Sequence, residues 1–128
     1  MTTIDDLLSR ARAAIDRFEP VEAQEEMRSG AVLVDIRSES QIARDGTVPG
    51  AIVVARNVLE WRCAPDGEHR DPRVSDPEVR LIVMCDAGYQ SSLATASLRE
   101  LGLHRAADLA GGFQAWRQAG LPISASAR

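Results

Sequence analysis

The sequence contains no lysine, so all fifteen of its basic residues are arginines. Any anion that the chain binds through side-chain charge must therefore be bound by arginine. The formal net charge is -4, and no basic stripe interleaved with aromatic residues occurs, so we expect no nucleic-acid partner. No apolar run approaches the roughly 20 residues of a membrane-spanning helix, so we expect no membrane association either.

Cysteine is almost as scarce, because only Cys63 and Cys85 occur. The N-terminus lacks the basic and apolar stretches of a signal peptide, and without an export signal two cysteines indicate a reducing compartment, the cytoplasm, rather than a disulfide framework. Two histidines and two separated cysteines match no recognised zinc-ligand spacing. We therefore expect no metal and no organic cofactor, and we interpret the acidic residues around His69 as a polar loop.

A length of 128 residues suits a single domain. Of these residues 45% are hydrophobic and 27% are charged, as in ordinary soluble globular proteins. Apolar residues at helical spacing predict an amphipathic helix over residues 3–16, with Thr3 as its cap. Pro20 suits the first turn of a second helix, which Gly30 would end. Both predicted helices precede the first continuous apolar run.

Short apolar runs follow, each too short for a helix and typical of strands buried on both faces. The predicted strands are residues 31–34, 51–54, 81–84 and 107–109. The predicted helices between and after them are residues 38–45, 91–101 and 113–118, whereas the proline-containing residues 62–78 read as a long loop. This alternation predicts an α/β fold with a largely parallel sheet, in which ligands bind beyond the carboxyl ends of the strands.

The segment after the third predicted strand, residues 85–92, leaves that strand and enters a helix. The first turn of a helix presents unpaired N–H groups and a partial positive charge, which stabilise a thiolate at Cys85. Gly88 permits the positive φ that a tight cradle needs, and successive amides form an anion-binding nest. The segment therefore predicts a sulfur nucleophile surrounded by donors. The alternative is that Cys85 is only a small buried core residue.

Three blocks of the sequence resemble single-domain rhodaneses. The first is Val34-Asp35-Ile36-Arg37 with residues 46–51, the second is the Cys85 loop, and the third is Leu109-Ala110-Gly111-Gly112-Phe113-Gln114-Ala115-Trp116 with residues 120–122. Together they cover about residues 20–123 in the family's order and spacing. The resemblance implies a rhodanese-like α/β domain at residues 19–128, with a central parallel sheet flanked by helices on both faces, and an N-terminal helical extension at residues 1–18.

The resemblance also implies an activity, that of a sulfurtransferase. Cys85 would take a sulfane sulfur from a donor such as thiosulfate or another persulfide, carry it as a persulfide, and pass it to a thiophilic acceptor such as a thiol or a protein. The implied substrate-binding residues are Asp86, Ala87, Gly88, Tyr89, Gln90 and Ser91. The residues with implied structural roles are Asp35, Arg37, Gly111, Gly112 and Trp116. Alternatively, Tyr89 shields the loop, and Ser91 or Ser92 caps the next helix, which is the role that we expect for the serines.

Some residues depart from the family pattern. Thr47 replaces the usual histidine, and Gln41 stands near a usual glutamate. Gln90 is neutral where many active rhodaneses carry a positive residue. Arg62, on the connection that follows residues 51–54, is the predicted substitute cation, and the alternative is a solvated loop arginine.

Two other functions compete with sulfur transfer. A phosphatase or arsenate reductase of related fold would bind its oxyanion through an arginine of the loop, and residues 86–92 contain none. A catalytically weak module for protein binding or sulfur sensing is favoured by Gln90 but has no need of Cys85. Cys63 could in addition form a disulfide with an oxidised or persulfidated Cys85, although most lone loop cysteines have no such role.

Overall fold

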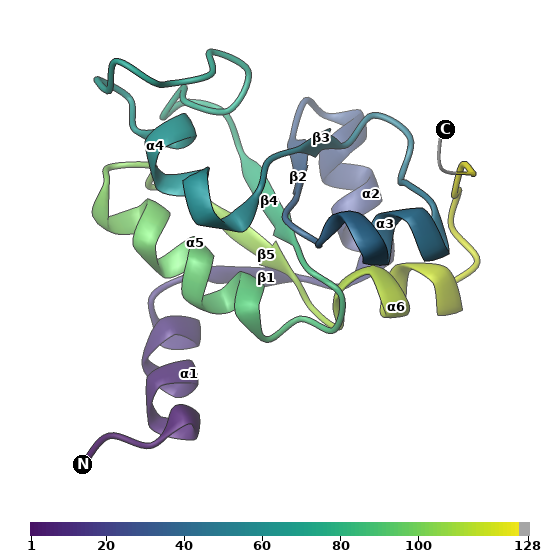
Figure 1. Cartoon of the computed structure of the whole chain (residues 1–128), viewed down its shortest axis with the longest axis horizontal. Helices are drawn as coiled ribbons and strands as arrows, with labels where there is room; N and C mark the ends of the chain where they lie inside the picture. Colours follow the sequence, from purple (N-terminus) through teal and green to yellow (C-terminus); the bar gives the residue numbers. More distant parts are fainter. Residues whose placement is uncertain (126–128) are drawn as a thin grey trace.

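A single parallel sheet organises the chain in the computed structural model, which describes residues 1–125 (Figure 1). Its five strands lie in the order β1-β5-β4-β2-β3, and every neighbouring pair is parallel. The strands are β1 (Asp16–Phe18), β2 (Val32–Asp35), β3 (Ile52–Val53), β4 (Leu81–Met84) and β5 (Ala107–Leu109). The predicted α/β class and the parallel sheet are confirmed.

Helices cover both faces of this sheet (Figure 1). One face carries α4 (Leu59–Cys63) and α5 (Gln90–Glu100), and α1 (Ile4–Ala13) packs against α5. The other face carries α2 (Pro20–Arg28), α3 (Glu39–Asp45) and α6 (Gly112–Gln118). A 3₁₀ turn, Arg56–Val58, leads into α4. Among the described helices none is both long enough and apolar enough to cross a bilayer.

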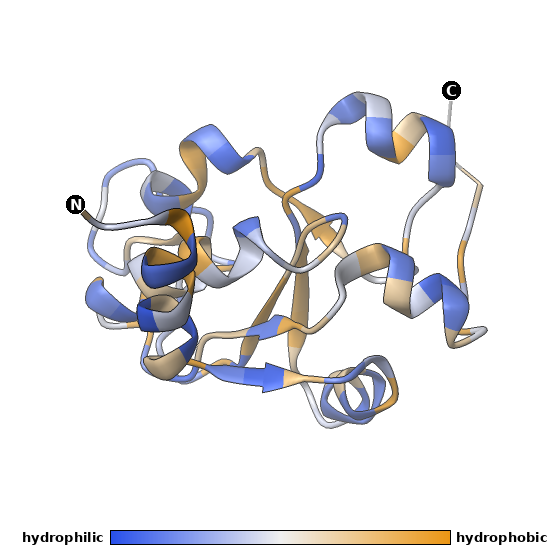
Figure 2. Cartoon of the chain, turned by 90° about the horizontal axis from the view of Figure 1, so that it is seen from below, coloured by the Kyte–Doolittle hydropathy of each residue, from blue (hydrophilic) through white to orange (hydrophobic). Residues whose placement is uncertain are grey.

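The central strand β4 shows why a continuous apolar run forms a strand here. Leu81 and Val83 point into the cluster under α4 and α5, whereas Ile82 and Met84 point into the cluster under α2 and α6. All four side chains are fully buried, which stabilises each by about 1.5–3 kcal/mol relative to an exposed position. Figure 2 shows the same arrangement as apolar strands enclosed by helices with polar outer surfaces.

Two predicted helix starts are confirmed. The Thr3 hydroxyl accepts the amide of Asp6, whose carboxylate in turn accepts the Thr3 amide, so a capping box begins α1. Pro20 is the first residue of α2, where its missing N–H costs nothing. The two helices therefore begin where local chemistry alone places them.

The N-terminal prediction needs a correction. The helix expected over residues 3–16 ends at Ala13, and residues 16–18 form the edge strand β1, paired in parallel with β5. Part of the expected helical extension is therefore a strand of the sheet. The sequence Asp16-Arg17-Phe18 has a single apolar residue, so it shows no strand periodicity. The helix α4 was also missed, because its five residues are too few to show a helical pattern.

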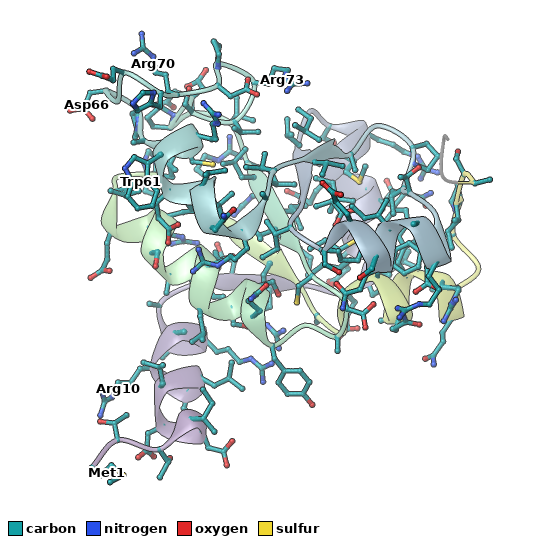
Figure 3. The ribbon with its side chains drawn as sticks, in the orientation of Figure 1. Met1, Arg10, Trp61, Asp66, Arg70 and Arg73 are labelled. Atoms are coloured by element: carbon teal, nitrogen blue, oxygen red, sulfur yellow. The ribbon has the colours of Figure 1, made fainter. Side chains whose placement is uncertain are left out.

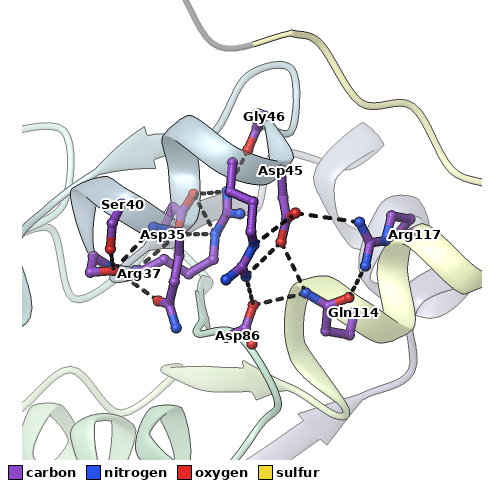
Figure 4. Close-up of polar contacts among 11 residues, drawn as sticks. Asp35, Arg37, Ser40, Asp45, Gly46, Asp86, Gln114 and Arg117 are labelled. Atoms are coloured by element: carbon purple, nitrogen blue, oxygen red, sulfur yellow. Dashed lines mark hydrogen bonds and ion pairs between the residues drawn. The ribbon is translucent and has the colours of Figure 1, made fainter.

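The carboxyl end of the sheet is where the predicted polar residues lie. Asp35 ends β2 opposite Met84, so Cys85 follows β4 at the same edge. Arg37 folds back on Asp35 with an Nη2–Oδ2 distance of 2.7 Å and donates to the Gly46 carbonyl at 2.9 Å (Figure 4). Its guanidinium carbon lies 3.9 Å from the centroid of the Phe113 ring. Both charged side chains are fully buried. The pair links β2 to the end of α3 and to α6.

A second Asp-x-Arg pair at the surface provides a matched control for the buried one. Arg73 binds Asp71 through the same four hydrogen bonds as join Arg37 to Asp35, from the backbone N–H and Nε to Oδ1 and from Nε and Nη2 to Oδ2. Its Nη2–Oδ2 distance is also 2.7 Å, but its side chain is 65% exposed (Figure 3). We expect Arg37→Met to lower the free energy of unfolding by about 3–5 kcal/mol, because Asp35 is left charged and buried without a cationic partner and keeps only the hydrogen bond from the backbone N–H of residue 37. Arg73→Met should cost far less, because water replaces the lost contact. Urea denaturation measures both, and equal losses would contradict the role given to burial.

Candidate functional site

The sulfur of Cys85 lies in a cradle of backbone amides. Cys85 directly follows β4, and its Sγ accepts the N–H groups of Gly88 at 3.2 Å and Ser91 at 3.3 Å. Gly88 has φ +87°, a backbone conformation that residues with a side chain rarely adopt. The sulfur therefore faces the first turn of α5, where the helix carries partial positive charge.

Two carbonyl groups of the same loop accept hydrogen bonds from α6 instead of facing the sulfur. The Cys85 carbonyl accepts the Phe113 amide at 2.9 Å, and the Asp86 carbonyl accepts the Gln114 amide at 3.1 Å. Both donors belong to the first turn of α6. Gly112 has φ +61°, and a Cβ added there would lie 2.5 Å from the Cys85 oxygen. The paired glycines thus let α6 approach the loop closely enough to bind its carbonyls.

A cavity of about 340 Å³ opens beside the sulfur. Its lining consists of Gln41, Cys85, Asp86, Ala87, Tyr89 and Gln90. Gln41 and Gln90 also line a neighbouring hollow of about 530 Å³ that contains Arg56. The structure therefore brings the loop residues predicted from the sequence together around Cys85, with Gly88 and Ser91 contributing their amides.

The side chain of Asp86 takes part in a polar network (Figure 4). Gln114 Nε2 donates to Asp86 Oδ1 at 2.9 Å and to Asp45 Oδ2 at 3.1 Å. Arg44 binds Asp45 at 2.8 Å and lies 3.7 Å from Asp86, and its hydrogen bonds lower the pKa of Asp45 to about 2. The network joins the loop to α3 and α6. The sequence offered one signal for it, Gln114 within the Gly-Gly-Phe-Gln block.

The serine hydroxyls at the start of α5 bind a buried carboxylate. Ser91 and Ser92 each donate to Asp108 Oδ2 at 2.8 Å, and Arg17 donates to Asp108 Oδ1 at 2.8 Å. The capping role expected for the serines is therefore wrong, because Tyr89 precedes the helix without any side-chain cap. Asp108 lies fully buried in β5. A charged residue inside the apolar run 107–109 was the signal that could have indicated this contact.

The structure does not bring Arg62 to the sulfur. Arg62 Nη1 donates to the His69 carbonyl at 3.0 Å and lines a separate hollow that shares no residue with the Cys85 cavity. Two other arginines, unsuspected from the sequence, contact the loop instead: Arg12 and Arg17 donate to the Gly88 carbonyl at 2.9 and 3.0 Å.

The other residues singled out from the sequence lie in the core. Trp116 is 1% exposed and donates its indole N–H to the Pro122 carbonyl at 2.9 Å. Cys63 is fully buried in α4 and forms no disulfide with Cys85. Burial, with the nearby carboxylates of Glu60 and Asp71, raises the pKa of the Cys63 thiol to about 12. Within residues 1–125 no three histidine, cysteine, aspartate or glutamate side chains gather as a metal site would require.

Comparison with known proteins gives one consistent family. A sequence model of the Rhodanese-like domain matches residues 19–119. A sulfurtransferase of Allochromatium vinosum is 33% identical over 94 residues, which cover 73% of this chain and 78% of that protein. The thiosulfate sulfurtransferase GlpE of Ectopseudomonas mendocina is 34% identical over 101 residues, which cover 79% and 84% of the two chains.

One solved structure is similar over almost its whole length. It belongs to a Rhodopseudomonas palustris protein of unknown function, described as a possible tyrosine phosphatase. The TM-score is 0.87 at 32% identity, and the superposition covers 95% of this chain and 94% of that one.

The close approach of α6 predicts different costs for two glycine substitutions. Gly112→Ala adds a Cβ within 2.7 Å of the Asp86 carbonyl oxygen, whereas Gly102, at φ +96°, has no atom within 4 Å of a Cβ. Both substitutions cost about 1–2 kcal/mol for the left-handed backbone. Gly112→Ala should cost at least twice as much and alter the alkylation rate of Cys85, and Gly102→Ala should not change that rate. Thermal melting and alkylation kinetics measure both effects, and similar behaviour of the two variants would contradict the contact.

The raised pKa of Cys63 predicts which thiol reacts. At about pH 9 an ordinary cysteine is substantially ionised, but folded Cys63 stays protonated because its pKa is about 12. Iodoacetamide should therefore label Cys85 and leave Cys63 unmodified until urea unfolds the chain. Peptide mapping by mass spectrometry reads both sites. Equal labelling of the two cysteines in the folded protein would show that Cys63 is not protected.

Proposed function

The chain belongs to the rhodanese-like domain family, and on this basis we propose that it is a sulfurtransferase that carries sulfane sulfur as a persulfide on Cys85. The observation that carries the proposal is the amide cradle, in which the Gly88 and Ser91 amides donate to the Cys85 sulfur. Amide donors in a buried site stabilise an anionic sulfur without adding a proton to it. The relatives named sulfurtransferases support the same chemistry.

In the loading step the Cys85 thiolate attacks the outer sulfur of the donor. With thiosulfate, a bond forms between Cys85 Sγ and that sulfur, the sulfur–sulfur bond of thiosulfate breaks, and sulfite leaves with the electron pair. Cys85 then carries a persulfide anion, whose terminal sulfur lies among the loop amides. No outside oxidant is consumed, because the sulfur already has the oxidation level of a sulfane.

In the transfer step a thiophilic acceptor attacks the terminal sulfur of the persulfide. The new bond to the acceptor forms as the bond to Cys85 Sγ breaks, and Cys85 leaves as the thiolate that the cradle stabilises. The acceptor is a small thiol, a protein thiol or, in an assay, cyanide. The donor is a small sulfur anion or a persulfide, and neither step calls for a metal or an organic cofactor.

Both cysteines are free thiols, and this supports a proposal about the cellular compartment of the reaction. A persulfide carrier needs a reduced thiol, and neither Cys63 nor Cys85 is part of a disulfide. Disulfides are rare where glutathione and thioredoxin keep thiols reduced. The proposal therefore includes the cytoplasm as the compartment of the reaction.

The phosphatase description of the Rhodopseudomonas palustris protein makes phosphate transfer a second candidate. Phosphatases with a cysteine loop bind the phosphate dianion, and bidentate arginine is the side chain best suited to that task. The cavity of Cys85 is lined by neutral residues and by Asp86, and arginine is absent from its lining within the described residues. The chemistry of the loop therefore favours sulfur transfer over phosphate transfer.

The proposal predicts a specific change of mass. Reduced protein incubated with thiosulfate should gain one sulfur atom on Cys85, because the cradle accommodates the persulfide anion. Cyanide should remove that atom, and Cys85→Ser should never acquire it. Cys63→Ser is the matched control and should load as the wild type does, because Cys63 is buried away from the cavity. Intact-mass spectrometry followed by peptide mapping makes the measurement.

Either of two results would contradict this prediction. One is the absence of any sulfur gain with thiosulfate and with a low-molecular-weight persulfide, which would favour a binding or sensing module. The other is phosphate release from an aryl phosphate that is lost in Cys85→Ser, which would favour the phosphatase.

A further inference from the structure

The loop of Cys85 is held from its outer side by two arginines of the N-terminal segment. Arg12 Nη2 and Arg17 Nη2 both donate to the Gly88 carbonyl, at 2.9 and 3.0 Å. Arg12 lies in α1 and Arg17 in β1, and both precede residue 19, where the family match begins. Because the family model does not cover these two residues, their role follows from the contacts that they make with this loop.

The Gly88 carbonyl determines which way the next peptide plane faces. The Gly88–Tyr89 peptide is trans, so the Tyr89 N–H points away from the carbonyl and from both guanidinium groups. Within residues 1–125 the Tyr89 amide has no hydrogen-bond acceptor, which leaves it available to a bound anion. Gly88 has no Cβ to resist rotation of this plane. The orientation of the Tyr89 amide therefore depends on what binds the Gly88 carbonyl.

The same two arginines place positive charge behind the loop. Arg17 is paired with the buried carboxylate of Asp108, at 2.8 Å. Arg12 pairs with no carboxylate of the described chain; its Nε donates to the Ser92 hydroxyl at 3.1 Å, and its guanidinium lies 5.6 Å from the Tyr89 ring centroid. Two guanidinium groups and one carboxylate leave one net positive charge. Partly buried charges of this kind are screened less than exposed ones.

We propose that Arg12 and Arg17 are positioning residues of the sulfur site, and that Arg12 supplies from behind the loop the cation that Gln90 lacks. The two side chains hold the Gly88 carbonyl outward, so the Tyr89 amide joins those of Gly88 and Ser91 around the bound anion. The donor class suited to this arrangement is a small sulfur-containing anion, for which thiosulfate is the probe. The role of the two arginines in sulfur transfer rests on the proposed function.

The test compares Arg12→Gln with Arg10→Gln. Both remove one positive charge from α1, but within the described residues Arg10 donates only to the Thr2 hydroxyl and points outward (Figure 3). The rate of Cys85 alkylation is measured with anionic iodoacetate and with neutral iodoacetamide at the same pH. The iodoacetate-to-iodoacetamide ratio should fall about fourfold in Arg12→Gln and keep its wild-type value in Arg10→Gln. Arg12→Lys, which keeps the charge, should restore most of the ratio.

This ratio isolates the charge behind the loop, because a general loosening of the loop changes both alkylation rates together. An unchanged ratio in Arg12→Gln, or an equal fall in Arg10→Gln, would overturn the inference. Melting temperatures establish that each variant is folded, and Arg12→Ala serves as a second variant with the same expected ratio.

The consequence for sulfur transfer is measured separately. The half-saturating concentration of thiosulfate for loading Cys85 should rise about fourfold in Arg12→Gln, with a smaller change of the limiting rate. A purely structural role would instead lower the melting temperature and leave this concentration unchanged. If wild-type protein takes up no sulfur, the proposed function is refuted, and the alkylation ratio still decides whether Arg12 supplies charge to Cys85.

Discussion

An anionic sulfur whose cavity has no cationic side chain among the described residues is stabilised here by a loop whose amides point toward it, and the buried carbonyls of that loop then need partners on the other side. Here the carbonyls of Cys85 and Asp86 bind the first turn of α6, and the Gly88 carbonyl binds two arginines. The amides of Gly88 and Ser91 are left for the sulfur. The reactive loop is therefore shaped by elements from both ends of the chain.

A second layer of polar contacts supports this arrangement. Asp108 is fully buried in β5 and accepts hydrogen bonds from Ser91, Ser92 and Arg17. A buried carboxylate without partners would be strongly unfavourable, so the start of α5 and the strand β1 are both drawn to the same point. Because the chain has no lysine, its basic side chains apart from two histidines are all guanidinium groups, each of which can bind two acceptors in one plane. Arg17 uses this property to bind Asp108 and the Gly88 carbonyl together.

The parts of the fold that could be predicted from the sequence are those determined by neighbouring residues. The run Leu81–Met84 is apolar on both faces, and Thr3 and Pro20 carry local signals of helix starts, so these elements were found. The strand β1 was missed, because Asp16-Arg17-Phe18 becomes a strand only by pairing with residues 107–109. Its stability comes from the partner strand rather than from its own pattern.

The candidate site shows the same division. The Cys85 loop was predicted from its glycine and its place between a strand and a helix. Arg62 was chosen as the substitute cation from its position along the chain, yet its guanidinium binds the His69 carbonyl in another hollow. Arg12 lies 76 residues before the Gly88 carbonyl that it contacts. Contacts over such a separation leave no local pattern of hydrophobicity or charge, so sequence reasoning had no means of finding them.

The place of β1 at the edge of the sheet has a dynamic consequence. An edge strand of three residues, paired on one side only, belongs to the part of a fold that opens at low free energy, long before the central strands do. Arg17 is carried by this strand, so each local opening of the edge withdraws one of the two guanidinium groups from the Gly88 carbonyl. The order of the sulfur loop is thereby coupled to fraying of the sheet edge, while β4, which carries the cysteine, stays fully packed.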